Sequence, residues 1–262
     1  LLASCSTQPP AAGPVIPVAA EWPFAMDAEP VRAERGMVVS TDAYASQVGV
    51  NVLMEGGNAV DAAVATSFAL AVVNPEAGNI GGGGFMVIRF ADGETAAVDY
   101  REKAPLAAHR DMYLAADGDL LEGYVHGHRA VGVPGAVAGL WAAHQRYGSV
   151  PWADLVAPAI ELAQGFEVRE RQAHSLGRSV DALGVEPATA EIFLPGGQPP
   201  PLGSTFVQSD LAATLGRIQE GGRDGFYLGE TADLIVAEME RGGGLITHED
   251  LAGYRAAWRE PI

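Results

Sequence analysis

The sequence predicts an α+β fold in which a short β-hairpin lies among helices. Residues 59–73 are apolar on nearly every side at helical spacing, which predicts a buried helix. Residues 85–90 and 95–101 are two strand-like segments joined by a turn, so they should pair antiparallel. Helical patterns dominate from residue 136 onwards. We therefore expect the β-structure early in the domain, with most of the helices after it.

Composition limits the possible classes of protein. The chain has 262 residues, of which 48% are hydrophobic and 19% charged, enough for one large domain or two small ones with a core. Sixteen basic residues against 33 acidic ones give a net charge of -17, which repels nucleic-acid phosphates and anionic lipid head groups. No segment reaches the roughly 18 to 20 consecutive apolar residues of a membrane span. We expect a globular protein that does not bind nucleic acid.

The first residues resemble the end of a bacterial lipoprotein leader. Leu-Ala-Ser precedes Cys5, the only cysteine, as in a lipobox. In this interpretation Cys5 is lipidated, residues 1–25 are a leader remnant with a tether, and residues 26–262 form the domain. The alternative is an arbitrary start with one inert thiol. The first interpretation predicts a periplasmic or cell-envelope protein with a lipid anchor.

Three elements are predicted before the hairpin. Residues 37–40 are a short apolar segment that predicts a strand, and a helix should start near Asp42 and end before Gly56. Asn58 is a suitable N-cap for the helix 59–73, and a first-turn acid three residues later favours the helix dipole. The following Asn-Pro pair should end this helix.

The first strand of the hairpin should be buried. Alternation along a strand places Phe85 and Val87 on one face and Met86 and Ile88 on the other, so both faces are apolar. Beyond the hairpin, glycines end several predicted helices, and Thr-His-Glu-Asp at 247–250 predicts a capping box. The predicted helices are 136–147, 152–164, 169–183, 210–220, 231–241 and a short one from 247; residues 254–262 resemble the start of another strand, so we expect a fragment.

The four glycines at 81–84 could indicate a phosphate-binding loop or close packing. They lack a following Lys-Ser or Lys-Thr and do not fit G-x-G-x-x-G. They also follow a helix and precede a strand, whereas phosphate loops follow a strand and open a helix. The pattern favours glycines that let another backbone segment approach closely.

Arg101 is the main candidate for binding a small ligand. In an extended strand its side chain would share a face with Asp99, and Glu102 follows it directly. One interpretation is a structural salt bridge with Asp99 or Glu102. The other is a carboxylate clamp, because a guanidinium offers two parallel donors and a flanking acid can hold it in place. The residues alone leave both open.

Other chemistry is weakly supported. His126 and His128 alternate in sequence but have no third ligand nearby, so a solvated surface is at least as good an interpretation as a metal site. There is no Gly-x-Ser-x-Gly motif, and no serine or threonine stands out as a nucleophile. No metal and no cofactor is predicted.

Several motifs in order resemble the large subunit of the γ-glutamyltranspeptidase family, over about residues 34–262. They are residues 56–65 (Gly-Gly-Asn-Ala-Val-Asp-Ala-Ala-Val-Ala), 78–86 (Gly-Asn-Ile-Gly-Gly-Gly-Gly-Phe-Met) and 99–105 (Asp-Tyr-Arg-Glu-Lys-Ala-Pro), with further likeness at 131–135, 147–163, 226–229 and 250–255. The resemblance implies an N-terminal-nucleophile (Ntn) hydrolase, an αββα sandwich made as one self-cleaving precursor. This chain would hold only part of the large subunit.

The resemblance also implies a reaction. A threonine freed at the start of the small subunit would attack a γ-glutamyl amide, with glutathione as donor, and pass the glutamyl group to water or an amine. Arg101 would bind the substrate α-carboxylate, with Asp99 and Glu102 supporting it. The nucleophile would lie beyond Ile262, so this chain alone should be inactive and its partner is its own small subunit.

Two alternatives stay open at this point. One is an amidase of the same fold, such as a cephalosporin acylase or a capsule poly-γ-glutamate depolymerase. The other is a non-catalytic lipoprotein that binds γ-glutamyl peptides through Arg101.

Overall fold

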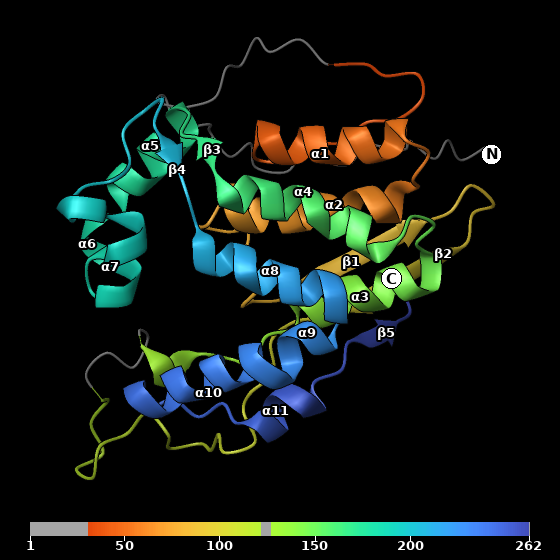
Figure 1. Ribbon diagram of the computed structural model, residues 1–262. Helices are drawn as coiled ribbons and strands as arrows, with labels where there is room; N and C mark the ends of the chain where they lie inside the picture. Colours follow the sequence, from red (N-terminus) through yellow and green to blue (C-terminus); the bar gives the residue numbers. More distant parts are fainter. Residues whose placement is uncertain (1–30, 122–126, 262) are drawn as a thin grey trace, which may run out of the picture. The chain divides into compact units, whose positions relative to one another are not determined.

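The computed structural model describes residues 31–121 and 127–261 (Figure 1). The chain divides into two units, residues 1–36 and 37–262, and the described part of the first unit, 31–36, carries no helix or strand. The predictions for Cys5, for the tether 1–25 and for His126 fall outside the described residues. All of the described helices and strands belong to the second unit.

Two helices with side-chain N-caps begin the domain. Helix α1, Ala43–Met54, is capped by Asp42, whose carboxylate accepts the backbone N–H of Tyr44 at 2.8 Å. Helix α2, Ala59–Val73, starts at Asn58 with a full capping box and ends at Asn74, as the sequence predicts. Most of α2 is buried, which confirms the prediction from its all-round apolar pattern.

Four helices pack as a row. Helix α2 contacts α1 on one side and α4, Trp152–Gln164, on the other, and α4 contacts α8, Ser209–Gly221 (Figure 1). Phe68 of α2 meets Trp152 edge to face, with ring centroids 5.4 Å apart. The core therefore runs through this helical row.

A three-stranded antiparallel sheet has the order β1-β2-β5. Strand β1 is Phe85–Arg89, β2 is Thr95–Asp99 and β5 is Ala257–Arg259. The predicted hairpin and the predicted terminal strand are both confirmed. One face of the sheet carries Val98 and Trp258 and packs toward helix α3, Ala136–Tyr147, where Tyr147 meets Trp258 edge to face.

The other face of the sheet is open, which corrects the prediction of a strand buried on both faces. Phe85 is 61% exposed and Val87 is 72% exposed. The alternation itself is as predicted, because Met86 and Ile88 pack against the core. Among the described residues, no element covers the face that carries Phe85 and Val87.

The remaining elements include several that the pattern did not predict. Residues 37–40 form no strand, because no described strand pairs with them, and Val39 is 82% exposed. The predicted helix 169–183 is interrupted at Ser179, whose backbone leaves the helical region. The other elements are α5 (Glu170–Arg178), α6 (Val180–Leu183), α7 (Pro187–Phe193), α9 (Asp224–Tyr227), α10 (Gly229–Gly242), α11 (His248–Gly253), the 3-10 turns His128–Ala130 and Pro195–Gly197, and the strand pair β3 (Phe166–Glu167) and β4 (Thr205–Phe206).

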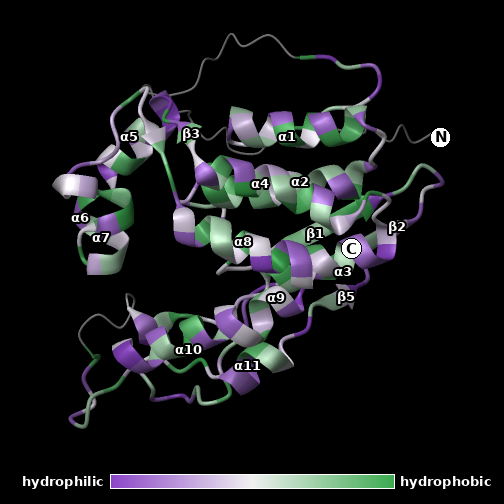
Figure 2. Cartoon of the chain, viewed as in Figure 1, coloured by the Kyte–Doolittle hydropathy of each residue, from purple (hydrophilic) through white to green (hydrophobic). Residues whose placement is uncertain are grey.

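Hydrophilic and hydrophobic residues alternate along α10, as expected for a helix with one buried face (Figure 2). Helix α11 begins at Thr247 with the predicted capping box, completed by Asp250. In the described part of the chain, every helix is too short or too polar to cross a bilayer.

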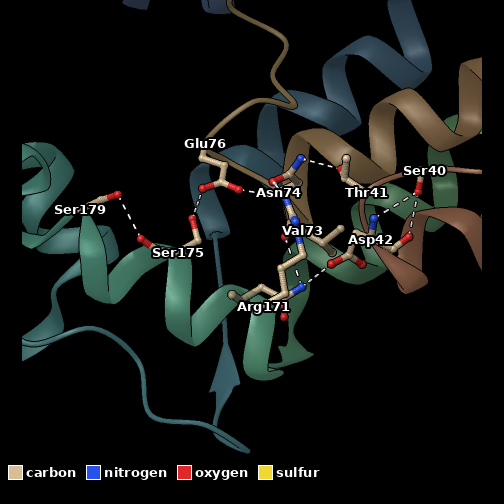
Figure 3. Close-up of polar contacts among 10 residues, drawn as sticks. Ser40, Thr41, Asp42, Val73, Asn74, Glu76, Arg171, Ser175 and Ser179 are labelled. Atoms are coloured by element: carbon tan, nitrogen blue, oxygen red, sulfur yellow. Dashed lines mark hydrogen bonds and ion pairs between the residues drawn. The ribbon is translucent and has the colours of Figure 1, made fainter. Parts of the chain in front are cut away.

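A polar network fixes the chain just before the glycine run (Figure 3). Asn74, which is buried, donates to the hydroxyl of Thr41 at 2.9 Å and accepts from Arg171 at 3.1 Å. Arg171 also binds the carboxylate of Glu76 at 2.8 Å, and the Ser175 hydroxyl donates to the same carboxylate. The end of α2 is thereby tied to the start of α1 and to α5.

The carboxylate of Asp61 holds the start of α2 against the loop before α4. It is fully buried and accepts the N–H of Asn58 at 2.9 Å and the hydroxyl of Ser149 at 2.6 Å. Burial by itself would raise the pKa of Asp61, but the hydrogen bonds from Ser149, Asn58 and Val150 favour the charged form and lower it. Because the pKa is lowered on folding, this contribution to stability is present above the ordinary value near 3.8 and is lost as the pH falls through the lowered one.

Replacement of this acid tests the capping interaction. We expect Asp61→Asn to lower the free energy of unfolding by about 2 to 4 kcal/mol at pH 7, because hydrogen bonds to a buried charge are lost. The difference from the unmutated protein should shrink as the pH falls below about 4. Asp154→Asn, at an exposed first-turn acid of α4, is the control and should change stability little. Thermal and urea unfolding at several pH values measure both; equal effects of the two variants would contradict the assignment.

Candidate binding site around Arg101

The site is the segment that directly follows β2, residues 100–103. The strand ends at Asp99, so Arg101 lies beyond it and not on the strand face of Asp99 as the sequence pattern predicts. The backbone N–H of Arg101 donates to the Asp99 carboxylate at 3.1 Å. The ladder ends here because the N–H of Arg101 is taken by the Asp99 side chain and not by a neighbouring strand.

The guanidinium of Arg101 is held by one edge. Its Nε donates to the carboxylate of Glu102 at 2.8 Å, and the side chain of Arg101 is 68% exposed. Within the part of the chain that the structure describes, no group binds its two terminal nitrogens. The salt bridge and the clamp considered from the sequence are therefore compatible, because the bridge leaves a pair of donors directed to solvent.

The carboxylate of Asp99 accepts hydrogen bonds from the backbone of Arg101 and from a second arginine. Its other carboxylate oxygen accepts from Arg259 of β5, at 3.1 Å from Nε and 2.9 Å from Nη2. The N–H of Arg101 and then the guanidinium of Arg259 lower the pKa of Asp99, so it is charged at neutral pH. Register explains the pairing, since Arg259 lies opposite Ala97 and next to Asp99 across the strands.

Tyr254, just before β5, holds the backbone of Arg101 in place. Its hydroxyl donates to the carbonyl oxygen of Arg101 at 2.8 Å, and its ring stacks on Tyr227 with centroids 5.8 Å apart. Burial, followed by the charges of Asp99 and Glu102, raises the pKa of Tyr254 to about 12. The phenol is therefore protonated and can donate.

The glycine run packs against the backbone of residues 100–102, which confirms the packing interpretation. A Cβ at Gly83 would lie 2.8 Å from the amide nitrogen of Glu102 and 2.9 Å from the Cα of Arg101. The carbonyl of Gly82 accepts two N–H groups at the start of α3, from Gly135 at 2.7 Å and Ala136 at 2.9 Å. The first N–H groups of α3 are thus bound by the carbonyl of Gly82, where a phosphate loop would offer such groups to a ligand.

His128 is hydrogen-bonded to a carboxylate of α10. Its Nε2 lies 2.6 Å from Glu238, and the hydrogen bonds from Arg241 and then His128 lower the pKa of Glu238 to about 2. Among residues 31–121 and 127–261, no group of three or more His, Cys, Asp or Glu side chains could hold a metal ion.

Sequence reasoning missed Tyr254 and Arg259. The residues 254–262 were expected to start a strand, but nothing in the pattern said which strand it would pair with. The available signal was chemical: the segment carries arginines, and the hairpin ends in an acid that could pair with one of them.

These residues can bind an anion but do not by themselves form a catalytic centre. An exposed guanidinium with one edge fixed matches the two oxygens of a carboxylate. The backbone of Arg101 is fixed by a hydrogen bond from the Tyr254 hydroxyl to its carbonyl and by one from its own N–H to the Asp99 carboxylate, so the cation is presented from a restrained segment.

Comparison with known proteins identifies the family. Residues 45–262 match the family model of the gamma-glutamyltranspeptidases. The chain is 48% identical over 229 residues to the glutathione hydrolase proenzyme of Pseudomonas aeruginosa and 49% identical over 236 residues to that of Escherichia coli. It therefore belongs to the γ-glutamyltranspeptidase family. These matches cover 87% and 89% of this chain but 40% and 41% of the relatives, so the chain spans about 40% of their length.

Solved structures agree with the predicted fold. The gamma-glutamyltranspeptidase of Helicobacter pylori superposes with a TM-score of 0.86 at 45% identity, covering 89% of this chain and 68% of that chain. A cephalosporin acylase from Bacillus halodurans gives a TM-score of 0.83 at 32% identity, covering 95% of this chain and 47% of that chain. The prediction of a partial Ntn hydrolase of the α+β class is confirmed.

The close packing of the glycine run can be tested within the run itself. We expect Gly83→Ala to cost about 1 to 3 kcal/mol of unfolding free energy, because its Cβ would meet the backbone of residues 100–102. Gly81→Ala is the matched control, since a Cβ there meets nothing within 4 Å. Its effect should stay within about 1 kcal/mol. Thermal unfolding of both variants is the measurement, and an equally stable Gly83→Ala protein would refute the packing account.

Proposed function

We propose that the full precursor to which this chain belongs is a γ-glutamyltransferase and glutathione hydrolase. The observation that carries the proposal is the Arg101 guanidinium, whose Nε is bound by Glu102 while its terminal nitrogens face solvent. Such a fork binds a carboxylate through two parallel hydrogen bonds. The Pseudomonas aeruginosa and Escherichia coli proenzymes, which are called glutathione hydrolases, support this choice of substrate.

In the proposed reaction, Arg101 binds the α-carboxylate of a γ-glutamyl compound and so fixes the position of its γ-carbonyl. A threonine hydroxyl in the part of the precursor after Ile262 adds to that carbonyl carbon, and its own α-amino group takes the proton. The C–N bond breaks and the amine leaves with a proton. Water or another amine then attacks the ester, releasing glutamate or a new γ-glutamyl compound and restoring the hydroxyl.

The open face of the sheet supports a two-subunit enzyme. Phe85 and Val87 share a face that no described element covers, and neighbouring exposed apolar side chains on a sheet are suited to a contact surface. We propose that the small subunit, produced by self-cleavage of the precursor, supplies the second sheet of the αββα sandwich against this face. The described fragment alone would lack both the nucleophile and this layer.

The acylase alternative differs in one substrate group. A glutaryl amide keeps the carboxylate that Arg101 would bind but lacks the α-amino group of a γ-glutamyl donor. The full-length protein should hydrolyse glutathione far faster than a glutaryl amide. The reverse preference would favour an enzyme like the acylases, which are also similar to this chain. Cleavage of neither would favour the non-catalytic binding protein.

The proposed location is the cell envelope, through a lipid on Cys5. Cys5 follows Leu-Ala-Ser and is the only thiol in the chain. We expect the full-length protein to incorporate labelled palmitate in a bacterial host and to fractionate with membranes, and Cys5→Ala to abolish both. Label that persists in the Cys5→Ala protein would contradict the anchor.

The carboxylate clamp has a matched test. Arg101→Lys removes the planar fork while keeping the charge, so we expect KM for a γ-glutamyl donor to rise about 10- to 100-fold with little change in self-cleavage. Arg110→Lys is the control, because Arg110 also donates its Nε to the next residue, Asp111, at 2.8 Å. Steady-state kinetics with γ-glutamyl-p-nitroanilide measure both. An unchanged donor KM in Arg101→Lys would exclude the clamp.

A further inference from the structure

The backbone at Arg101 is fixed by groups from a distant segment of the chain. Its carbonyl accepts the hydroxyl of Tyr254 at 2.8 Å, across a separation of 153 residues. A hydrogen bond of this length from a phenol is short enough to restrain the peptide that carries the guanidinium.

Tyr254 is itself held firmly. Its ring is stacked on Tyr227 at an interplanar angle of 12°, and the ammonium of Lys103 lies 4.9 Å from its centroid. Gly135 contacts its hydroxyl end, where a Cβ would overlap the ring. Tyr254 is 2% exposed, so its hydroxyl has no freedom to seek another partner.

The Tyr254 hydroxyl is also protonated, as a hydrogen-bond donor must be. Burial and the nearby carboxylates of Asp99 and Glu102 raise the pKa of Tyr254 to about 12, so it stays a donor throughout the pH range in which the enzyme would work.

From this geometry we infer that Tyr254 is a positioning residue for the carboxylate clamp: it fixes the peptide of Arg101 so that the guanidinium meets the substrate carboxylate. The inference rests on the proposed function. It concerns affinity for the donor and not the chemical step, because Tyr254 contacts the backbone of Arg101 and not its guanidinium.

A double-mutant cycle in the full-length protein separates this role from a general loss of structure. Tyr254→Phe removes only the hydroxyl. We expect KM for γ-glutamyl-p-nitroanilide to rise about 3- to 10-fold, as for the loss of one hydrogen bond, with kcat changed less than about twofold. In an Arg101→Lys background the same change should add less than about twofold, because the fork that Tyr254 positions is already gone.

Tyr44→Phe is the matched control, since its hydroxyl also donates to a backbone carbonyl, that of Glu167, at 3.2 Å and away from the site. It should leave donor KM unchanged in both backgrounds. An unchanged KM in Tyr254→Phe overturns the inference, as does a lower kcat at constant KM or a full additional effect in the Arg101→Lys background.

The outcome for the unmutated protein separates the two proposals. If it releases p-nitroaniline and Arg101→Lys raises KM, the proposed function stands whatever Tyr254→Phe does. If the unmutated protein does not cleave the γ-glutamyl donor, the proposed function fails and the inference fails with it.

Discussion

The approach of the Gly83 backbone to residues 100–102 is the constraint on which the site depends. Any side chain at Gly83 would enter the space of the Arg101 and Glu102 backbone. Because Gly82 next to it accepts two N–H groups from the start of α3, the glycine run links this helix to the segment that carries Arg101. The close packing of the glycines thus restrains the backbone of residues 100–102, which carries Arg101.

Tyr254 and Arg259, which lie more than 150 residues later in the chain, also restrain this segment. Tyr254 binds the carbonyl of Arg101, and Arg259 binds Asp99, whose other oxygen accepts the N–H of Arg101. Arg259 lies in β5 and Tyr254 lies just before it, so both contacts need β5 to be paired with β2. The side chain of Arg101 remains 68% exposed, so these contacts fix its backbone and leave the terminal nitrogens open.

The helix caps and the hairpin could be predicted from the local sequence. Asn58 and Thr247 cap helices because their side chains accept N–H groups three residues on, and the hairpin follows from alternation and a turn. The exposure of Phe85 could not be predicted, because alternation separates the two faces of a strand but does not say which face another element covers. Tyr254 was missed for another reason: its contact with Arg101 spans 153 residues, and such contacts depend on strand pairing that local patterns do not specify.

The most direct test of the central claim, that Arg101 binds the substrate carboxylate, is a crystal structure of the full-length protein with bound L-glutamate. We expect two nitrogens of Arg101 within about 2.7 to 3.1 Å of the two α-carboxylate oxygens, with Glu102 still on Nε. A carboxylate bound elsewhere, with the terminal nitrogens of Arg101 directed to solvent as they are here, would contradict the account.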